Sequence, residues 1–189
     1  VIANSISARI SPDLLINISD GSVLGRYMTT NSGRTIRAFM GIPYAAPPLK
    51  SLRFRAPQSV RSWKPSTLNA QTEPPKCLQV NLPTKNVEGQ EDCLYLNVYA
   101  PEVPHSEGKK YSVMVFFHGG SFLSGSGGVS EFGPDYLVDA DVILVTGNYR
   151  LGILGFLSTE DEHSSGNFGL KDQVAILKWV QQNIEHFHG

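Results

Sequence analysis

The chain has 189 residues, of which 41% are hydrophobic and 10% aromatic, and its net charge is -1. This length suits one domain over residues 1–189, and this composition excludes a disordered chain. The balanced charge lacks the basic excess of a nucleic-acid-binding protein, and no apolar run reaches the roughly 20 residues of a membrane span. We therefore expect neither a nucleic-acid partner nor a membrane span.

Three short strands are predicted near the start of the chain. The runs Leu14 to Ile18 and Val23 to Met28 are rich in apolar and β-branched residues, and Asp20-Gly21 between them is typical of a hairpin turn. A third strand is predicted at 35–40. The stretch from about 41 to 91 holds eight of the twelve prolines and is predicted to be irregular, because proline interrupts helices and inner strands.

From residue 94 the pattern predicts alternating strands and helices. The segment 94–100 alternates like a half-buried strand, and 113–117 and 142–146 are continuous apolar runs, typical of strands covered on both faces. A short helix is predicted to begin at Pro134. A longer amphipathic helix is predicted from the spacing of six apolar residues, Leu170, Val174, Leu177, Val180, Ile184 and Phe187. This order predicts an α/β fold, in which an antiparallel hairpin leads into a mostly parallel, doubly wound sheet.

The most distinctive local motif is a glycine loop directly after the predicted strand at 113–117. It reads His118-Gly119-Gly120-Ser121-Phe122. Glycines let the backbone turn with positive φ, and consecutive N–H groups there can point at one developing negative charge, as an oxyanion hole requires. An ordinary glycine-rich loop between a strand and a helix could have the same sequence, so the motif alone leaves both interpretations open.

Metal binding is not indicated by the histidines. His186 and His188 are two residues apart at the end of the predicted helix, and no His-Glu-x-x-His spacing occurs. Asn17-Ile18-Ser19 is the one N-glycosylation sequon and falls at a predicted turn. We therefore expect no metal site and regard Asn17 as a candidate glycosylation site.

A set of further motifs occurs in an order that resembles one family. The motifs are Gly41-Ile42-Pro43-Tyr44, Leu52-Arg53-Phe54, Trp63, Glu91-Asp92-Cys93-Leu94, the glycine loop at His118, Asn148-Tyr149-Arg150-Leu151-Gly152, and Gly166 to Gln173. Over nearly the whole chain this set resembles the type-B carboxylesterase and cholinesterase family, and insect carboxylesterases in particular. The resemblance implies the N-terminal part of an α/β-hydrolase fold. It also implies a serine hydrolase that cleaves small-molecule esters without a cofactor.

The resemblance further implies that part of the active site is absent from these residues. Family members are about three times longer, and their nucleophile lies in a Gly-x-Ser-x-Gly elbow that would begin about nine residues beyond Gly189. The 189 residues contain no such sequence, and the nearest segment, 125–128, has the wrong spacing. We therefore expect an incomplete domain, truncated before the elbow, without the serine, acid and histidine of the triad and dependent on the remainder of the hydrolase domain. The first residue, Val1, is typical of a processed product, a fragment or a trimmed chain.

Carried over by motif, the family assigns roles to three loop residues. The backbone N–H groups of Gly120 and Ser121 would be oxyanion donors, and Gly119 would give the turn its freedom. Ser121 stands where many members have glycine. Its N–H is retained, but its side chain reduces the room for the acyl group.

Structural pairs follow from the same resemblance. The family's disulfide at Glu-Asp-Cys implies a Cys77–Cys93 bond and, with it, a secreted or extracellular location. Two free thiols in a cytosolic protein are the alternative. Charges in the family's motifs imply two buried ion pairs, Arg150 with Asp172 and Arg53 with Glu91, against the alternative of separate solvated charges.

Three functional hypotheses remain from the sequence. The first is carboxylic ester hydrolysis by a serine acyl-enzyme mechanism in the parent protein, with residues 1–189 alone inactive. The second is a non-catalytic adhesion or binding protein of the same family, and the third is an inactive truncated product. The intact glycine loop favours the enzyme, because an adhesion protein has no need of oxyanion donors.

Overall fold

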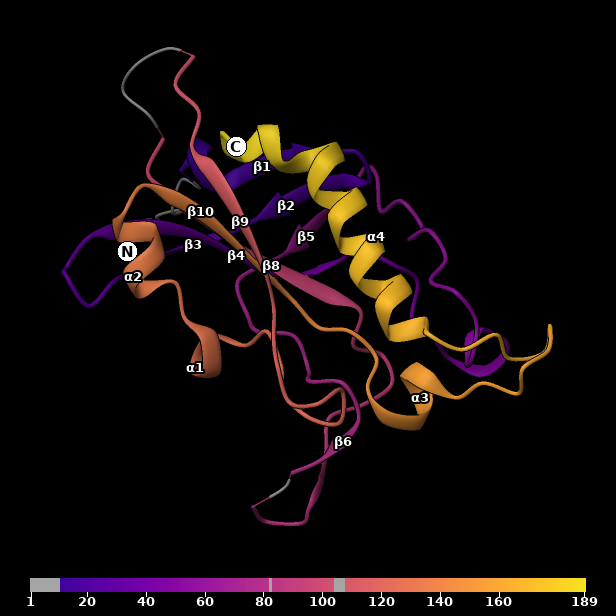
Figure 1. Cartoon of the computed structure of the whole chain (residues 1–189). Coiled ribbons are helices and arrows are strands. Elements are labelled where there is room, and N and C mark those ends of the chain that lie inside the picture. Colours follow the sequence, from indigo (N-terminus) through magenta and orange to yellow (C-terminus); the bar gives the residue numbers. More distant parts are fainter. Residues whose placement is uncertain (1–10, 82, 104–107) are drawn as a thin grey trace, which may run out of the picture.

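A five-stranded sheet forms the centre of the structure (Figure 1), a computed structural model that describes residues 11–81, 83–103 and 108–189. The first ten residues of the predicted domain thus lie outside the described part. In spatial order the strands are β3 (Arg26–Thr29), β4 (Thr35–Pro43), β8 (Tyr95–Pro101), β10 (Val142–Gly147) and β9 (Ser112–Phe117). Within this sheet, as far as it is described, β9 and β10 pair in parallel, whereas the other three pairings are antiparallel. The prediction of a mostly parallel sheet is therefore wrong for this part of the chain. Parallel neighbours need a long crossover, and here that crossover is the segment 118–141.

The predicted N-terminal hairpin is present, but it belongs to a second, smaller sheet. After a 3₁₀ turn, η1 (Pro12–Leu14), β1 (Leu15–Ile18) pairs antiparallel with β2 (Gly21–Leu24), and β5 (Thr67–Asn69) adds in parallel to β2. The single strand predicted at 23–28 is instead divided between β2 and β3 at Gly25. At this point the backbone passes close to the ring of Phe39, which a Cβ at Gly25 would overlap.

The described residues of the proline-rich stretch 41–91 are mostly irregular, as predicted, and beyond the end of β4 they form β5 and other short elements. The other elements are η2 (Lys50–Leu52), β6 (Gln79–Val80) and β7 (Val87–Glu88), of which β6 and β7 pair with each other. Trp63 fastens this stretch to the smaller sheet, because its Nε1 donates to the Ser22 carbonyl at 2.9 Å and its ring occupies the space beside Gly21.

Helices cover both faces of the central sheet (Figure 1). They are α1 (Val129–Phe132), α2 (Asp135–Asp139), α3 (Gly152–Phe156) and α4 (Phe168–Asn183), the last followed by the 3₁₀ turn η3 (Ile184–Phe187). Successive side chains of a strand point to opposite faces. Ile143 of β10 accordingly packs in the core beneath α4, while Leu144 packs in the core that contains Val138 of α2. The helix predicted from Pro134 corresponds to α2.

β9 is an edge strand among the described residues, with β10 as its neighbour on one side. The prediction that both apolar runs are covered on both faces holds for β10, whose residues 143–147 are buried. It is wrong for β9, where Met114 is 47% exposed. The difference follows from position, because a strand at the edge of a sheet is shielded by fewer neighbours.

Of the six apolar positions predicted to face the core along α4 and η3, Val180 and Phe187 are buried, but the first three are not. Leu170, Val174 and Leu177, predicted to face the core, are 41%, 48% and 47% exposed. The buried positions of α4 are Phe168, Gly169, Asp172, Ile176, Trp179, Val180 and Asn183. Two of these are polar side chains with hydrogen-bond partners inside the protein. A periodicity based on hydrophobicity assigns such residues to solvent, which explains the error.

Candidate active site at the glycine loop

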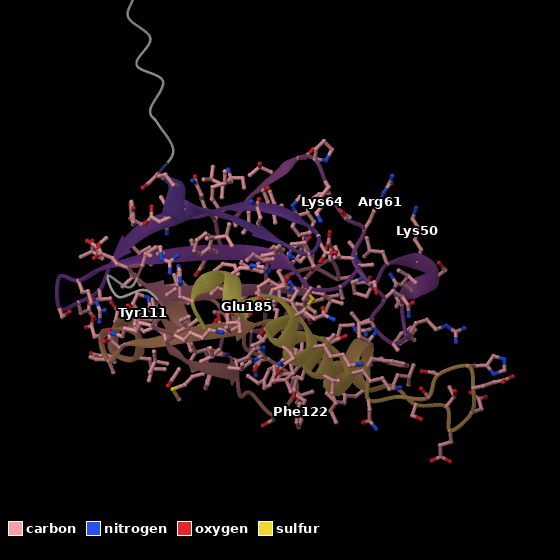
Figure 2. All side chains as sticks on the ribbon, turned by 90° about the horizontal axis from the view of Figure 1, so that it is seen from above. Lys50, Arg61, Lys64, Tyr111, Phe122 and Glu185 are labelled. Carbon is pink, nitrogen blue, oxygen red and sulfur yellow. A yellow bond between two sulfur atoms is a disulfide. The ribbon has the colours of Figure 1, made fainter. Side chains whose placement is uncertain are left out.

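The glycine loop His118–Phe122 starts at the carboxyl end of β9, beside the carboxyl end of its parallel neighbour β10. Open α/β sheets bind ligands at this edge. The chain leaving β10 brings Tyr149 against the loop, and its ring stacks on His118 with the centroids 4.4 Å apart. Phe122 is 47% exposed and lies on the opposite side of the molecule from Lys50 and Lys64 (Figure 2). The loop therefore has a packed inner side and a side that is open to solvent.

The backbone of the loop turns through three consecutive residues with positive φ. Gly120 has a φ of 108°, and a Cβ there would collide with the Ser124 carbonyl, so this position requires glycine. Ser121 and Phe122 adopt left-handed conformations at 55° and 60°, which are uncommon for residues with a side chain. Gly119 does not have a positive φ, and a Cβ there would meet open space. The conformational freedom expected at Gly119 is thus used at Gly120, because the turn begins one residue later.

Three successive carbonyl groups of the loop are held by hydrogen bonds. Tyr149 Oη donates to the His118 carbonyl at 2.7 Å. His118 Nδ1 lies 2.9 Å from the Gly119 carbonyl oxygen, which can only accept. The Gly120 carbonyl accepts from the amides of Leu123 and Ser124 at 2.9 and 3.2 Å. Because each peptide group is planar, fixing a carbonyl also fixes the direction of the N–H on the next residue.

The N–H groups oriented in this way belong to Gly119, Gly120 and Ser121. Within the described ranges, the amides of Gly120 and Ser121 donate no hydrogen bond, and both residues are exposed. Two adjacent, oriented and unpaired donors can stabilise negative charge that develops on a ligand oxygen.

His118 is the buried side chain that fixes the Gly119 carbonyl. It is 3% exposed, and burial lowers its pKa from the ordinary 6.5, against smaller opposing effects of the Gly119 carbonyl and Glu131. A neutral imidazole that donates from Nδ1 keeps its Nε2 free of a proton. In the described part of the chain, Nε2 has no hydrogen-bond partner. The hydrogen bond from the imidazole to the loop is therefore made by the Nδ1 proton.

The chain continues from the glycine loop through Gly125 to Gly127, where it is anchored on the central sheet. Asn97 Nδ2 and Thr146 Oγ1 donate to the Gly127 carbonyl at 3.0 and 2.7 Å, and Asn148 Oδ1 accepts from its N–H at 2.8 Å. The roles of Tyr149, Asn97 and Asn148 were not predicted. Asn148 and Tyr149 occur in a motif quoted above, and Asn97 lies in the strand predicted at 94–100, but neither observation indicates which backbone groups these side chains hold.

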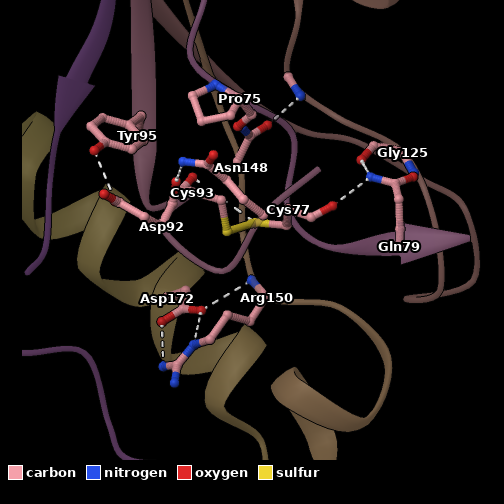
Figure 3. The surroundings of a disulfide bond; sticks show 12 residues. Pro75, Cys77, Gln79, Asp92, Cys93, Tyr95, Gly125, Asn148, Arg150 and Asp172 are labelled. Atoms are coloured by element: carbon pink, nitrogen blue, oxygen red, sulfur yellow. Dashed lines mark hydrogen bonds and ion pairs between the residues drawn. A yellow bond between two sulfur atoms is a disulfide. The ribbon is translucent and has the colours of Figure 1, made fainter. Parts of the chain in front are cut away.

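The structure contains the predicted disulfide and both predicted ion pairs. Arg150 follows Tyr149 and binds Asp172 of α4 through two side-chain bonds of 2.8 Å, with side chains 4% and 0% exposed. Cys77 and Cys93 form the predicted disulfide (Figure 3). Arg53 binds Glu91 through its Nε at 2.6 Å, but the two side chains are 45% and 21% exposed. This last pair is therefore not buried, because it lies on the surface of the irregular stretch.

The other candidate residues lie outside the glycine loop. Asn17 is an exposed residue within β1 and not in the turn, and its Oδ1 accepts from Ser22 Oγ at 2.6 Å. His186 and His188 lie at the end of the chain in and after η3. In the ranges that the structure describes, no group of three or more His, Cys, Asp or Glu could hold a metal ion. No helix described here has the length and apolar character needed to cross a bilayer.

Several known proteins with similar sequences are named esterases. A model of the carboxylesterase family matches residues 12–189. Juvenile hormone esterase of Tribolium castaneum is 50% identical over 93% of this chain and 30% of that protein. Esterase E4 of Myzus persicae is 46% identical over 92% of this chain and 32% of that protein. Carboxylesterase 5A of Canis lupus familiaris is 42% identical over 89% and 31%, respectively.

A solved structure agrees with the sequence comparison. The crystal structure of juvenile hormone esterase from Manduca sexta, with OTFP covalently attached, matches with a TM-score of 0.84 and 37% identity. The match covers 93% of this chain and 34% of that one. The chain thus spans about a third of the length of these relatives and has the fold of the N-terminal part of an α/β hydrolase. With the family's match over residues 12–189, this chain belongs to the carboxylesterase family.

Proposed function

We propose that the protein containing this chain is a carboxylic ester hydrolase with a serine acyl-enzyme mechanism, in which this chain supplies two oxyanion donors. The observation that carries the proposal is the set of held carbonyls at His118, Gly119 and Gly120. They leave the N–H groups of Gly120 and Ser121 oriented and unpaired among the described residues. Family membership supports the same conclusion.

In this mechanism the two N–H groups act on the substrate carbonyl. When a nucleophile attacks an ester, the carbonyl oxygen gains negative charge, and preorganised donors stabilise that charge without reorganising during the reaction. Neutral His118 and Tyr149 hold the donors in place. The serine, acid and histidine of the triad belong to the remainder of the hydrolase domain, on which the activity depends. Small-molecule esters are the proposed substrates, and the mechanism needs no cofactor.

The binding-protein hypothesis is less well supported by the same geometry. A surface used only for adhesion gains nothing from consecutive amides kept free of partners, and Ser121 and Phe122 hold a left-handed backbone that is unfavourable for non-glycine residues. Backbone conformations of this kind cluster at catalytic sites, where their conformational free-energy cost is offset by function.

Activity of the full-length protein tests the proposal. A purified preparation should hydrolyse a chromogenic short-chain ester with saturable kinetics, and a serine-directed organophosphate should abolish the turnover with a stoichiometry of one. A folded full-length protein that is inactive and is not labelled by the organophosphate would support the binding-protein hypothesis instead.

Secretion and glycosylation are part of the proposal. The Cys77–Cys93 disulfide supports an oxidising compartment, and the exposed amide of Asn17 is accessible for N-glycosylation. Protein recovered from the medium of insect cells should lose mass on treatment with peptide-N-glycosidase, and Asn17→Gln should remove that difference. Retention of the protein inside the cells, with both thiols free to alkylation, would contradict this part.

A further inference from the structure

The segment closed by the Cys77–Cys93 disulfide contacts Gly125, three residues after the glycine loop, through Gln79. This residue lies in β6, two positions after Cys77, and is 7% exposed. Figure 3 shows its side-chain amide facing Gly125. Gln79 Oε1 accepts from the Gly125 N–H at 2.7 Å, and Gln79 Nε2 donates to the Gly125 carbonyl at 2.8 Å. The side chain thus pairs with both backbone groups of Gly125.

A third hydrogen bond fixes the orientation of this amide. Gln79 Nε2 also donates to the carbonyl of Cys77 at 3.0 Å. Both hydrogens of the amide therefore face carbonyl oxygens, and its oxygen faces an N–H. Only a neutral amide of this length satisfies the three partners, because a carboxylate has no hydrogen to donate and an apolar side chain leaves all three unpaired.

Gly125 lies directly behind the groups that orient the oxyanion donors. Its φ is 113°, and a Cβ there would be 2.5 Å from His118 Nδ1 and 2.7 Å from the Gly119 oxygen. The backbone of Gly125 is thus packed against both ends of the hydrogen bond between His118 and Gly119. That bond sets the direction of the Gly120 N–H. A displacement of Gly125 would therefore disturb the hydrogen bond between His118 and Gly119 and, with it, the direction of the Gly120 N–H.

From these contacts we infer that Gln79 is a positioning residue for the oxyanion donors. It ties the disulfide-closed segment to Gly125 and so keeps His118 and the Gly119–Gly120 peptide in place. The inference rests on the proposed function for its effect on catalysis, but its structural part concerns the glycine loop alone. Gln79 touches no reacting group, and its influence passes through Gly125.

The test compares four forms of the full-length protein: wild type, Gln79→Glu, Gln79→Met and the control Gln90→Glu. Gln79→Glu places a carboxylate against two carbonyl oxygens, and Gln79→Met keeps the length and removes the hydrogen bonds. Gln90 belongs to the same disulfide-closed segment, but its side chain is exposed and donates to the Asp92 carbonyl, away from the glycine loop. Each form is measured by hydrogen–deuterium exchange and by kcat and KM on a chromogenic short-chain ester.

We expect both Gln79 variants to exchange faster in the peptide covering 118–127, with exchange in β4 and β10 unchanged. We also expect kcat to fall about 10-fold at a nearly constant KM, less than the 10²–10³-fold lost when an oxyanion donor itself is removed. Gln90→Glu should match the wild type in both measurements. If Gln79→Glu fails to fold, the exchange and the kcat of Gln79→Met alone test the inference.

Two results would overturn the inference. One is unchanged exchange at 118–127 in a folded Gln79 variant. The other is faster exchange that is confined to residues 77–93, which would mean that Gln79 stabilises only its own segment. If the wild-type protein has no esterase activity, the proposed function fails, and the exchange data still decide the role of Gln79.

Discussion

At the scale of single residues, the chemistry of this site belongs to the backbone, and the side chains around it fix peptide groups. His118 and Tyr149 each bind a carbonyl, and the useful donor is the N–H on the other side of the peptide bond. The glycine motif alone left an ordinary loop open, and the donor roles of Gly120 and Ser121 came from the family resemblance and stay a prediction. The sequence could not predict that Gly120 and not Gly119 needs glycine, since that depends on where Ser124 folds back.

The buried imidazole of His118 predicts a pH dependence of stability. Burial lowers its pKa below the ordinary 6.5, so the unfolded chain binds this proton more readily than the folded protein does. The stabilising contribution is therefore complete above about pH 6.5 and is lost as the pH falls toward the lower folded-state pKa. His188, whose pKa burial also lowers, contributes in the same direction.

Urea unfolding of the full-length protein at pH 7.5 and 5.5 measures this effect. Wild type should be less stable at pH 5.5, and His118→Asn should show a smaller difference between the two pH values. His163→Asn, at a side chain that is 79% exposed, serves as the matched control and should behave like the wild type. Equal pH dependence in wild type and His118→Asn would contradict this assignment.

At the scale of elements, hydrophobic periodicity located the strands and the long helix but misjudged what covers them. The run at 113–117 has the composition of an inner strand, yet β9 is at the edge of the described sheet. In α4, Asp172 and Asn183 take buried positions because Arg150 and the backbone satisfy their polar atoms. Pairing of this kind depends on residues far away in the sequence, so a local pattern cannot indicate it.

The buried face of α4 can be tested with two adjacent residues. Ile176 is fully buried and packs against the main core, whereas Leu177 is 47% exposed. Ile176→Ala should lower the free energy of unfolding by about 2–5 kcal/mol, because it leaves a cavity in the core. Leu177→Ala should cost clearly less. Urea unfolding of both variants in the full-length protein provides the comparison, and a larger loss for Leu177→Ala would contradict the orientation of the helix.

At the scale of the whole molecule, the 189 residues contain the proposed oxyanion loop and the residues that support it, without a Gly-x-Ser-x-Gly sequence. The outer edge of β9 has no partner strand among the described residues. Exposed strand edges are templates for association between chains. The resemblance to a longer family predicts an incomplete domain, and an unpaired outer edge of β9 among the described residues is what that prediction would require.

Residues 1–189 expressed alone should therefore be sparingly soluble and should hydrolyse no ester above the rate of denatured protein. Oriented donors do little without a nucleophile and a base to activate it. The measurement is hydrolysis of a chromogenic short-chain ester by the purified chain, with the full-length protein as the positive control. Saturable turnover by the short chain that an organophosphate blocks would refute the prediction.

The most direct measurement for the central claim compares kcat of the full-length protein with those of its Gly120→Ala and Gly119→Ala variants. A Cβ at Gly120 would collide with the Ser124 carbonyl, whereas one at Gly119 would meet open space. If the loop provides the oxyanion donors, Gly120→Ala should lower kcat by at least about 10²-fold. Gly119→Ala should lower it far less, with both variants folded by circular dichroism. A Gly120→Ala enzyme with wild-type kcat, or equal losses in the two variants, would contradict the account.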